Sequence, residues 1–307
     1  MVPTMVWLPE PPESIGGLPD GMAADVWAGG DSLPDSAGEV EVIVMPFRAT
    51  PAMTAKVARL PNLKLIQLRS AGAEAVMPHV PDHVTVCNAR GAHDPATAEW
   101  VVGAIFAQSR NLPRFIRSQK TGLWDPAVSD GVAGKHVLIV GYGSIGAAVE
   151  RRLAGWEVTV ERIARRARPD EDVGGIDELY GALPRADVVV LLVPVTGQTQ
   201  NLADAKFLAA MKDGALLVNA ARGPIVDTRA LLRELNSGRL KAALDVTDPE
   251  PLPDGHPLWR APNALVTPHV GGMVRAAGSR AAAVVRAQLA RYAAGEPLEN
   301  VIGPQGY

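Results

Sequence analysis

The chain of 307 residues contains one cysteine, Cys87, so no disulfide can form within it. Basic and acidic residues nearly balance, at 30 and 33, so the basic excess that is usual in nucleic-acid-binding proteins is missing. No apolar run approaches the roughly 20 residues needed to cross a bilayer. The first ten residues lack the basic region and apolar centre of a signal peptide. These absences predict a cytoplasmic protein without nucleic-acid or membrane partners.

The composition is that of a folded protein with a core, since 47% of the residues are apolar and 21% are charged. The length predicts roughly two domains. The 30 glycines and 26 prolines are spread between apolar segments, as in the turns of a compact fold. Cys87 ends the apolar run Val84–Cys87 and is interpreted as a packed core thiol. The loosest stretch, Pro9 to Gly21, is predicted to be a surface loop.

Short strand-like runs alternate with helix-like segments such as Thr50–Leu60 in the first third of the chain. This alternation is typical of parallel strands joined by crossover helices, so it predicts a small α/β domain. The predicted strands of this domain are Met5–Leu8, Val40–Met45, Leu63–Leu68 and Val84–Cys87.

The same alternation continues beyond a predicted helix at Thr97–Gln108, and there it predicts a doubly wound, Rossmann-like parallel sheet. Small residues on that helix favour a domain or subunit boundary, with an ordinary core helix as the alternative. A last helix, about Arg275–Ala294, is expected to return to the first domain. The predicted strands of the sheet are His136–Val140, Val158–Val160, Asp187–Val193, Ala215–Val218, Ala242–Val246 and Ala264–Val266, with a helix at Ser144–Leu153.

A glycine-rich turn follows the first of these strands directly, in the form G-x-G-x-x-G. Gly141 permits the tight turn, Gly143 allows close approach of a pyrophosphate, and Gly146 lets helix and strand pack closely. Ser144 and Ile145 begin the helix, whose free N–H groups favour an anion. The turn therefore predicts dinucleotide binding, and the alternative is a glycine-rich turn without a ligand.

The choice of dinucleotide depends on the residues about 20 positions beyond the first glycine, where NAD-binding units carry an acidic residue for the ribose. Glu161 could take that role, but only one of Glu161 and Arg162 can point at the ribose. The cluster that begins at Arg162 and includes Arg165 suits a 2′-phosphate. We therefore favour NADP over NAD, and the alternative is a solvated basic turn.

Three further segments place an ionisable side chain just beyond a strand, where ligands of doubly wound sheets bind. Arg222 can hold a carboxylate and polarise a neighbouring carbonyl. His269, oriented by the carboxylate of Glu250, can give a proton to a carbonyl oxygen while hydride reaches the carbon. Taken singly, these residues have other interpretations: a helix cap, a loop charge and a structural histidine. Their joint placement favours catalysis.

These motifs together resemble the D-isomer-specific 2-hydroxyacid dehydrogenase family over nearly the whole chain. The likeness lies in Asn219–Asp227, Glu250-Pro251, Thr267–Gly272 and the loop Ser70–Ala73. The resemblance implies a nucleotide-binding domain, residues 97–275, inserted into a flavodoxin-like substrate domain of residues 1–96 and 276–307. It also implies a homodimer formed through the nucleotide-binding domains, and no metal.

The resemblance further implies individual roles. Arg222 would bind the substrate carboxylate and carbonyl, His269 would donate or accept the proton, and Glu250 would support His269. Asp245 would contact the nicotinamide carboxamide. The loop of Ser70, Ala71 and Gly72 would bind the substrate carboxylate, and the remaining cofactor contacts would be Pro194, Ala220, Ala221 and Gly271.

The chain departs from the family pattern at several positions. Arg162 stands where many NAD-using members carry an aspartate, which supports NADP. Met273 and Val274 replace a polar residue, which predicts a more apolar pocket wall. Trp100 replaces a common histidine after Glu99.

The favoured activity is reduction of glyoxylate, hydroxypyruvate or a similar 2-oxo acid with NADPH. The presence of Glu250 argues against formate dehydrogenases, which usually have a glutamine there. The alternatives are an NAD(P)H-binding sensor or co-repressor-like adaptor without turnover, and oxidation of an unusual donor such as phosphite.

Overall fold

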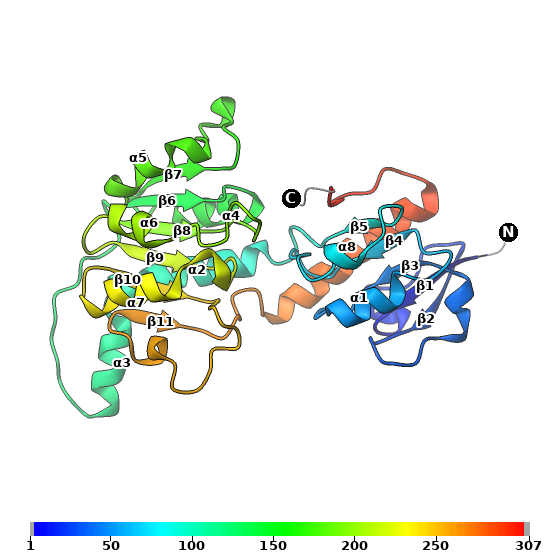
Figure 1. Cartoon of the computed structure of the whole chain (residues 1–307), viewed down its shortest axis with the longest axis horizontal. Coiled ribbons are helices and arrows are strands. Elements are labelled where there is room, and N and C mark those ends of the chain that lie inside the picture. The colour runs from blue at the N-terminus through cyan, green and yellow to red at the C-terminus, as the bar shows by residue number, and fades with distance from the viewer. Residues whose placement is uncertain (1–2, 304–307) are drawn as a thin grey trace. The chain divides into compact units, whose positions relative to one another are not determined.

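The computed structural model describes residues 3–303, which fold into two compact α/β units (Figure 1). The first unit contains the chain up to His93 together with the chain from Met273 onward, and the second unit is Asp94–Gly272. The chain thus leaves the first unit once, forms the whole of the second unit, and then returns to the first. No helix of the described residues is long and apolar enough to cross a membrane.

The first unit is built on a five-stranded sheet in the order β2-β1-β3-β4-β5, in which all pairs are parallel. Its helices include α1 (Pro51–Val57) and α8 (Arg275–Ala294). Four strands lie close to their predicted positions, and their bounds are β1 Thr4–Leu8, β3 Val40–Val44, β4 Leu65–Gln67 and β5 Thr85–Cys87.

One strand of the first unit was missed by the sequence analysis. Strand β2, Met22–Val26, lies at the edge of the sheet beside β1. None of its residues is fully buried, so it carries little of the apolar signal that marks the other strands. The predicted loop Pro9–Gly21 leads into it and contains a short 3-10 helix, η1 (Pro12–Ile15), whose Ile15 is buried. Burial of Ile15 anchors this loop to the core.

Helix α8 packs on one face of the five-stranded sheet, as expected for a last helix that returns to the first domain. Its Val285 and Leu289 are buried with Val6 and Val42 of the sheet. Cys87 is fully buried in the same cluster, which confirms the prediction of a packed thiol. The other face is covered too, since Ile43 and Ile66 of the sheet are buried with Val57 of α1, as parallel sheets require.

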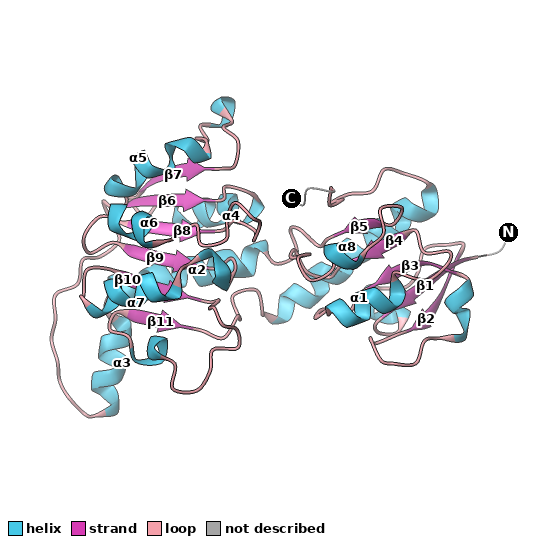
Figure 2. Cartoon of the chain, in the orientation of Figure 1, coloured by secondary structure: helices cyan, strands magenta, loops and turns pink. Residues whose placement is uncertain are grey.

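The second unit is built on a six-stranded parallel sheet in the order β11-β10-β9-β8-β6-β7. Figure 2 shows its strand arrows all pointing the same way. Its helices are α2 Asp94–Ser109, α3 Leu112–Lys120, α4 Ser144–Leu153, α5 Leu179–Ala182, α6 Ala205–Ala210 and α7 Thr228–Asn236. The strands are β6 His136–Val140, β7 Thr159–Ile163, β8 Val188–Leu191, β9 Leu216–Asn219, β10 Lys241–Leu244 and β11 Ala264–Val266.

The order of strands creates a switch point beside β6. From β6 the chain first moves outward to β7 and then returns to pair β8 on the other side of β6. In doubly wound sheets the crevice at such a point, outside the carboxyl ends of the strands, is where ligands bind. The Rossmann-like architecture expected from the sequence is therefore present, and it directs attention to the loop after β6.

Strand β7 extends three residues beyond its predicted end at Val160, to Ile163. Glu161 and Arg162 therefore lie within a strand, where consecutive side chains point to opposite faces. An isolated parallel bridge between Ile163 and Gly174 continues the pairing past β7. Since β7 is otherwise an edge strand, it tolerates the polar residues that hid its length in the sequence.

Candidate active site

The glycine loop after β6 has the geometry of a phosphate cradle. Gly141 has φ +99°, and a Cβ there would lie 2.6 Å from the carbonyl carbon of Leu192, so no other residue fits. A Cβ at Gly146 would lie 3.2 Å from a side-chain carbon of Ile139, which keeps α4 close to β6. Around Gly143, by contrast, no atom lies within 4 Å of the added Cβ. This open side leaves room for a pyrophosphate.

Helix α4 begins immediately after that open position. Its N-cap residue is Gly143, which has no side chain to cap the first turn. The N–H groups of Gly141 and Tyr142 both donate to the carbonyl of Ile163, at 2.8 and 3.0 Å, and so hold the loop against β7. The first-turn N–H groups of a helix have no partner within the helix and favour anions. The loop therefore fits the pyrophosphate of a dinucleotide.

The two charged residues of β7 have separate partners. Glu161 accepts from Nε2 of His136 at 2.8 Å and from Nη2 of Arg185 at 2.7 Å. His136 is the first residue of β6, so Glu161 is held beside the amino end of that strand. This arrangement gives Glu161 a structural ion pair, rather than a position at the carboxyl ends where the ribose was expected.

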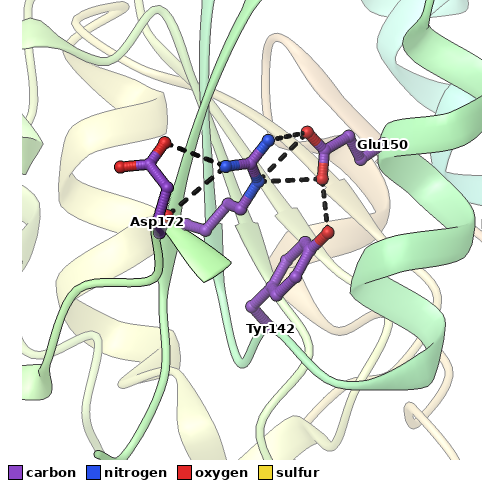
Figure 3. Close-up of polar contacts among 4 residues, drawn as sticks. Tyr142, Glu150 and Asp172 are labelled. Carbon is purple, nitrogen blue, oxygen red and sulfur yellow. Dashed lines mark hydrogen bonds and ion pairs between the residues drawn. The ribbon is translucent and has the colours of Figure 1, made fainter. Parts of the chain in front are cut away.

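Arg162 lies in an ion-pair network with Glu150 of α4 and with Asp172, as Figure 3 shows. Its Nε donates to Glu150 Oε2 at 2.9 Å, its Nη2 also donates to Glu150, and its Nη1 donates to Asp172 Oδ2 at 3.0 Å. The Arg162 guanidinium holds the pKa of the Glu150 carboxyl below its ordinary value. Any contact of Arg162 with a cofactor phosphate would compete with these bonds.

Tyr142, the residue between the first two glycines, joins the same network. Its hydroxyl donates to Glu150 Oε2, and its ring centroid lies 5.6 Å from the guanidinium carbon of Arg162 and 5.9 Å from that of Arg168. Burial, and then the bond to Glu150, raises the pKa of Tyr142. Sequence analysis did not single out Tyr142 or Glu150, although a tyrosine inside the motif with an acidic residue two helical turns later was visible.

The remaining arginines of the cluster lie on the loop after β7. Arg165 and Arg166 are exposed, whereas Arg168 donates through Nη2 to the carbonyl of Tyr142 at 2.9 Å and pairs with Glu171. Arg165, the second arginine expected at the cofactor, thus differs from Arg162 in being exposed on a loop at the carboxyl end of its strand.

The predicted contact between His269 and Glu250 is present. Nδ1 of His269 and Oε1 of Glu250 are 2.6 Å apart, and both side chains are partly exposed. His269 follows β11 and Glu250 follows β10, which are neighbouring strands of the sheet. Because Nδ1 faces the carboxylate, Nε2 is the ring nitrogen left to meet a substrate.

Asp245 organises the loop that carries His269. This buried carboxylate accepts from Thr267 Oγ1 at 2.6 Å and from the backbone N–H groups of Val270 and Gly271 at 2.9 and 2.8 Å. The backbone carbonyl of Asp245 accepts from the N–H of His269 at 2.7 Å, and His269 has φ +54°. Asp245 therefore supports the histidine loop directly. Its predicted contact with the nicotinamide stays a prediction.

Gly271 and Trp100 complete the packing of this loop. A Cβ at Gly271 would lie 2.8 Å from Oδ2 of Asp245 and 3.4 Å from Cγ of Trp100. A larger residue at position 271 would thus break a bond that holds the loop. Trp100, which departs from the family pattern, here supports the loop that follows His269, and its neighbour Glu99 pairs with Arg152 at 3.2 Å.

Arg222 is positioned by the loop after β9. Asn219 donates through Nδ2 to the carbonyl of Arg222 at 2.9 Å and accepts from the N–H of Ala221 at 3.1 Å. A Cβ at Gly223 would lie 1.9 Å from the carbonyl oxygen of Thr247, so the loops after β9 and β10 touch closely. The structure thus brings the loops of Arg222, Glu250 and His269 to one edge of the sheet.

The other predicted contacts are placed as follows. Pro194 follows β8, and its carbonyl accepts from Thr199 Oγ1 at 2.6 Å, while Ala220 follows β9. The loop Ser70–Gly72 belongs to the first unit, where Ser70 Oγ donates to the carbonyl of Gly72 at 3.0 Å. The side chain of Asn88 donates to the carbonyl of Ala71 at 2.7 Å. Their roles toward substrate and cofactor stay predictions. The described residues contain no cluster suited to a metal.

Known proteins of similar sequence share the nucleotide-binding unit of this chain. Residues 102–271 match the model of the D-isomer specific 2-hydroxyacid dehydrogenase NAD binding domain. A glyoxylate reductase of Thermofilum pendens is 34% identical over 249 residues, which cover 77% of this chain and 74% of the relative. Other similar proteins are named D-3-phosphoglycerate dehydrogenase and formate dehydrogenase, so the relatives differ in substrate.

Two solved structures resemble the whole chain. A D-isomer specific 2-hydroxyacid dehydrogenase from Xanthobacter autotrophicus Py2, in complex with NADPH and MES, has a TM-score of 0.85 at 30% identity and covers 99% of both chains. An NADPH-dependent glyoxylate/hydroxypyruvate reductase from Sinorhizobium meliloti, in complex with NADP and sulfate, has a TM-score of 0.85 at 27% identity and covers 100% of both chains.

Proposed function

Because the chain belongs to the D-isomer specific 2-hydroxyacid dehydrogenase family, we propose that it reduces a small 2-oxo acid of the glyoxylate or hydroxypyruvate type with NADPH. The reverse reaction oxidises the corresponding D-2-hydroxy acid. The observation that carries the proposal is the His269–Glu250 pair, at 2.6 Å, at the carboxyl ends of the same sheet that bears the glycine loop.

The proposed reaction needs a hydride from the cofactor and a proton from the protein. A bound reduced nicotinamide supplies hydride to the carbonyl carbon. His269 donates the proton from Nε2 to the carbonyl oxygen, so that one hydride and one proton convert the 2-oxo acid into the 2-hydroxy acid. Glu250 holds Nδ1 and keeps the ring oriented, so that Nε2 is directed at the carbonyl oxygen. Asp245 keeps the His269 loop in place through its bonds to Thr267, Val270 and Gly271.

We assign binding of the substrate carboxylate to a charged side chain, that of Arg222. The guanidinium of Arg222 binds the carboxylate and polarises the carbonyl, because a planar fork of N–H donors matches both oxygens. The cofactor contacts of Pro194, Ala220, Ala221, Asp245 and Gly271 are part of the same proposal.

NADPH is proposed over NADH on two grounds. Glu161, the one acidic candidate for the ribose, is already bonded to His136 and Arg185. Arg165 and its neighbour Arg166 are exposed on the loop after β7, where a guanidinium can meet a 2′-phosphate. The two structural relatives described above were solved with NADPH or NADP, which agrees with this choice.

We also propose that the enzyme is a cytoplasmic homodimer formed through the second unit. Helix α3 and the segment after it expose several large apolar side chains within a short stretch, and a gathering of such side chains marks an interaction site. Trp124 is 93% exposed and Val128 is 98% exposed. A second copy of the chain would cover them. The exposed apolar residues of this arm are Leu112, Ile116, Leu123, Trp124 and Val128.

The decisive experiment follows nicotinamide absorbance with glyoxylate or hydroxypyruvate, using NADPH and NADH in parallel. We expect consumption of NADPH to exceed that of NADH clearly. Faster consumption of NADH would keep the enzyme and overturn the cofactor proposal. Binding of NADPH without turnover of any 2-oxo acid, in a folded protein, would favour the sensor interpretation instead.

A further inference from the structure

Tyr142 connects the glycine loop to three other parts of the second unit. Its hydroxyl bonds to Glu150 on α4, and its ring lies near the guanidinium of Arg162 on β7. Its carbonyl accepts from Arg168, and its N–H donates to Ile163 at the end of β7. The residue beside the pyrophosphate site is thus held from both its backbone and its side chain (Figure 3).

The guanidinium of Arg162 is largely occupied by this network. A guanidinium has five N–H donors on three nitrogens, and all three nitrogens of Arg162 already donate to Glu150 or Asp172. The Glu150 side chain is only 22% exposed. Turning Arg162 toward a phosphate would therefore leave a partly buried carboxylate without its counter-charge, which is unfavourable.

We infer that Arg162, Glu150 and Tyr142 form a positioning unit that holds the glycine loop for the pyrophosphate, and that Arg162 does not read the 2′-phosphate. This inference rests on the proposed function, since it presumes that a dinucleotide binds the loop. The pyrophosphate is common to NADPH and NADH, so the unit serves both cofactors equally. Discrimination between the two cofactors then falls to the exposed loop after β7.

The physical reason is preorganisation. A loop that is already held in its binding conformation loses less conformational freedom when the ligand arrives. Removal of one bond in the unit loosens Tyr142, and with it the entry into α4, before any phosphate is bound. The cost then appears in the dissociation constants of both cofactors.

The test measures dissociation constants for NADPH and for NADH by fluorescence titration, with Tyr142→Phe and Glu150→Gln. We expect each variant to weaken both cofactors by the same factor, about 3- to 10-fold, which corresponds to one lost hydrogen bond. The ratio of the two constants should stay within about 2-fold of wild type. Arg165→Ala should instead weaken NADPH alone, by about 10-fold or more.

Glu161→Gln is the matched control, because it weakens the other ion pairs of the same strand on the opposite face. We expect Glu161→Gln and Glu150→Gln to lower the melting temperature by a similar amount, and only Glu161→Gln to leave cofactor affinity unchanged. If both variants weakened cofactor binding equally, the Arg162, Glu150 and Tyr142 network would only stabilise the fold and would not position the glycine loop.

Failure of the inference can be distinguished from failure of the proposed function. A selective loss of NADPH in Arg162→Ala, with NADH unaffected, would overturn the inference, because Arg162 would then read the 2′-phosphate. Wild-type affinities in Tyr142→Phe and Glu150→Gln would also overturn it. Failure of the wild-type protein to bind either cofactor would instead remove the proposed function itself.

Discussion

The two units of the molecule share one architecture and differ in the loop after their first strand. In the first unit β1 is followed by Pro9-Glu10-Pro11, and Glu10 pairs with Arg69 at 3.1 Å. In the second unit β6 is followed by the glycine loop and the N-terminus of α4. Both first strands lie inside an all-parallel sheet beside a switch point. A parallel sheet therefore offers a crevice, but the residues of one loop decide whether a phosphate can bind there.

The charge and the backbone donors of the two loops explain this difference. In the first unit, the carboxylate of Glu10 would repel a phosphate. Pro9 and Pro11 on either side of it have no backbone N–H group to donate. The glycine loop has an open side at Gly143 and leads directly into the first turn of α4. The second unit is therefore the nucleotide-binding one by local chemistry, although its fold is not unique to it.

The largest expected effect concerns the loops of the second unit that carry the proposed catalytic residues. His269→Ala should lower kcat by about 100- to 10,000-fold, because the proposed proton donor is lost. Cofactor affinity should stay near wild type, since the glycine loop is distant in sequence and unchanged. Steady-state rates together with NADPH titration check both statements. Glu250→Gln should lose less than His269→Ala, and turnover of His269→Ala within a few-fold of wild type would remove this residue from its role.

A pair of alanine substitutions compares the two first loops directly. Gly141→Ala combines a positive φ with a Cβ 2.6 Å from the backbone of Leu192, and should cost roughly 2–5 kcal/mol of unfolding free energy. Gly17→Ala has φ +92° but no atom within 4 Å of its Cβ, so strain alone should cost about 1–2 kcal/mol. Urea unfolding measures both. Only Gly141→Ala should abolish NADPH binding, and equal costs would contradict the clash.

Exposed apolar surface is also unequal between the units. Trp124→Ser combined with Val128→Ser should convert the proposed dimer into a monomer, because apolar area that drives association is removed. Light scattering at micromolar concentration measures the mass. Val26→Ser, at a half-exposed valine of the first unit, is the control and should leave the dimer intact. A wild-type protein that already has the mass of one chain would refute the proposed interface.

The smallest expected effects separate the units by pH. Burial raises the pKa of the Cys87 thiol from 9.0 to about 11, so the folded state keeps it protonated longer than the unfolded chain does. Its contribution to stability is present below pH 9 and is lost as pH rises from 9 to 11. Denaturant midpoints across that range should fall less in Cys87→Ala than in wild type. Rapid labelling of the native thiol at neutral pH would contradict this burial.

The second unit should lose stability at the acidic end instead. The pKa of Glu150 is lowered from 4.5, chiefly by its bond to Arg162, so its contribution is present above pH 4.5 and is lost as pH falls through the lower folded value. Glu150→Gln should flatten the acid limb of the stability profile. An acid limb that is identical in the variant and in wild type would show that the pair adds nothing.

Much of the fold and part of the site could be predicted from local sequence. Strands β6 and β11 and helices α4 and α8 have the predicted bounds, because apolar residues bounded by glycine or proline are strong local signals. Strand β2 was missed and β7 was predicted too short, because edge strands tolerate polar residues. The pair of His269 and Glu250 was predicted because each follows a strand of one parallel sheet.

The sequence by itself determined the parallel α/β class, the glycine loop, and the order of Arg222, Glu250 and His269, since each depends on a few consecutive residues. Only the tertiary structure decided the partners of the charged side chains. Arg162 bonds to Glu150, Glu161 bonds to His136, and Asp245 holds the histidine loop. Such pairs depend on strand register and on the rotation of α4 against the sheet, which arise when distant segments pack together.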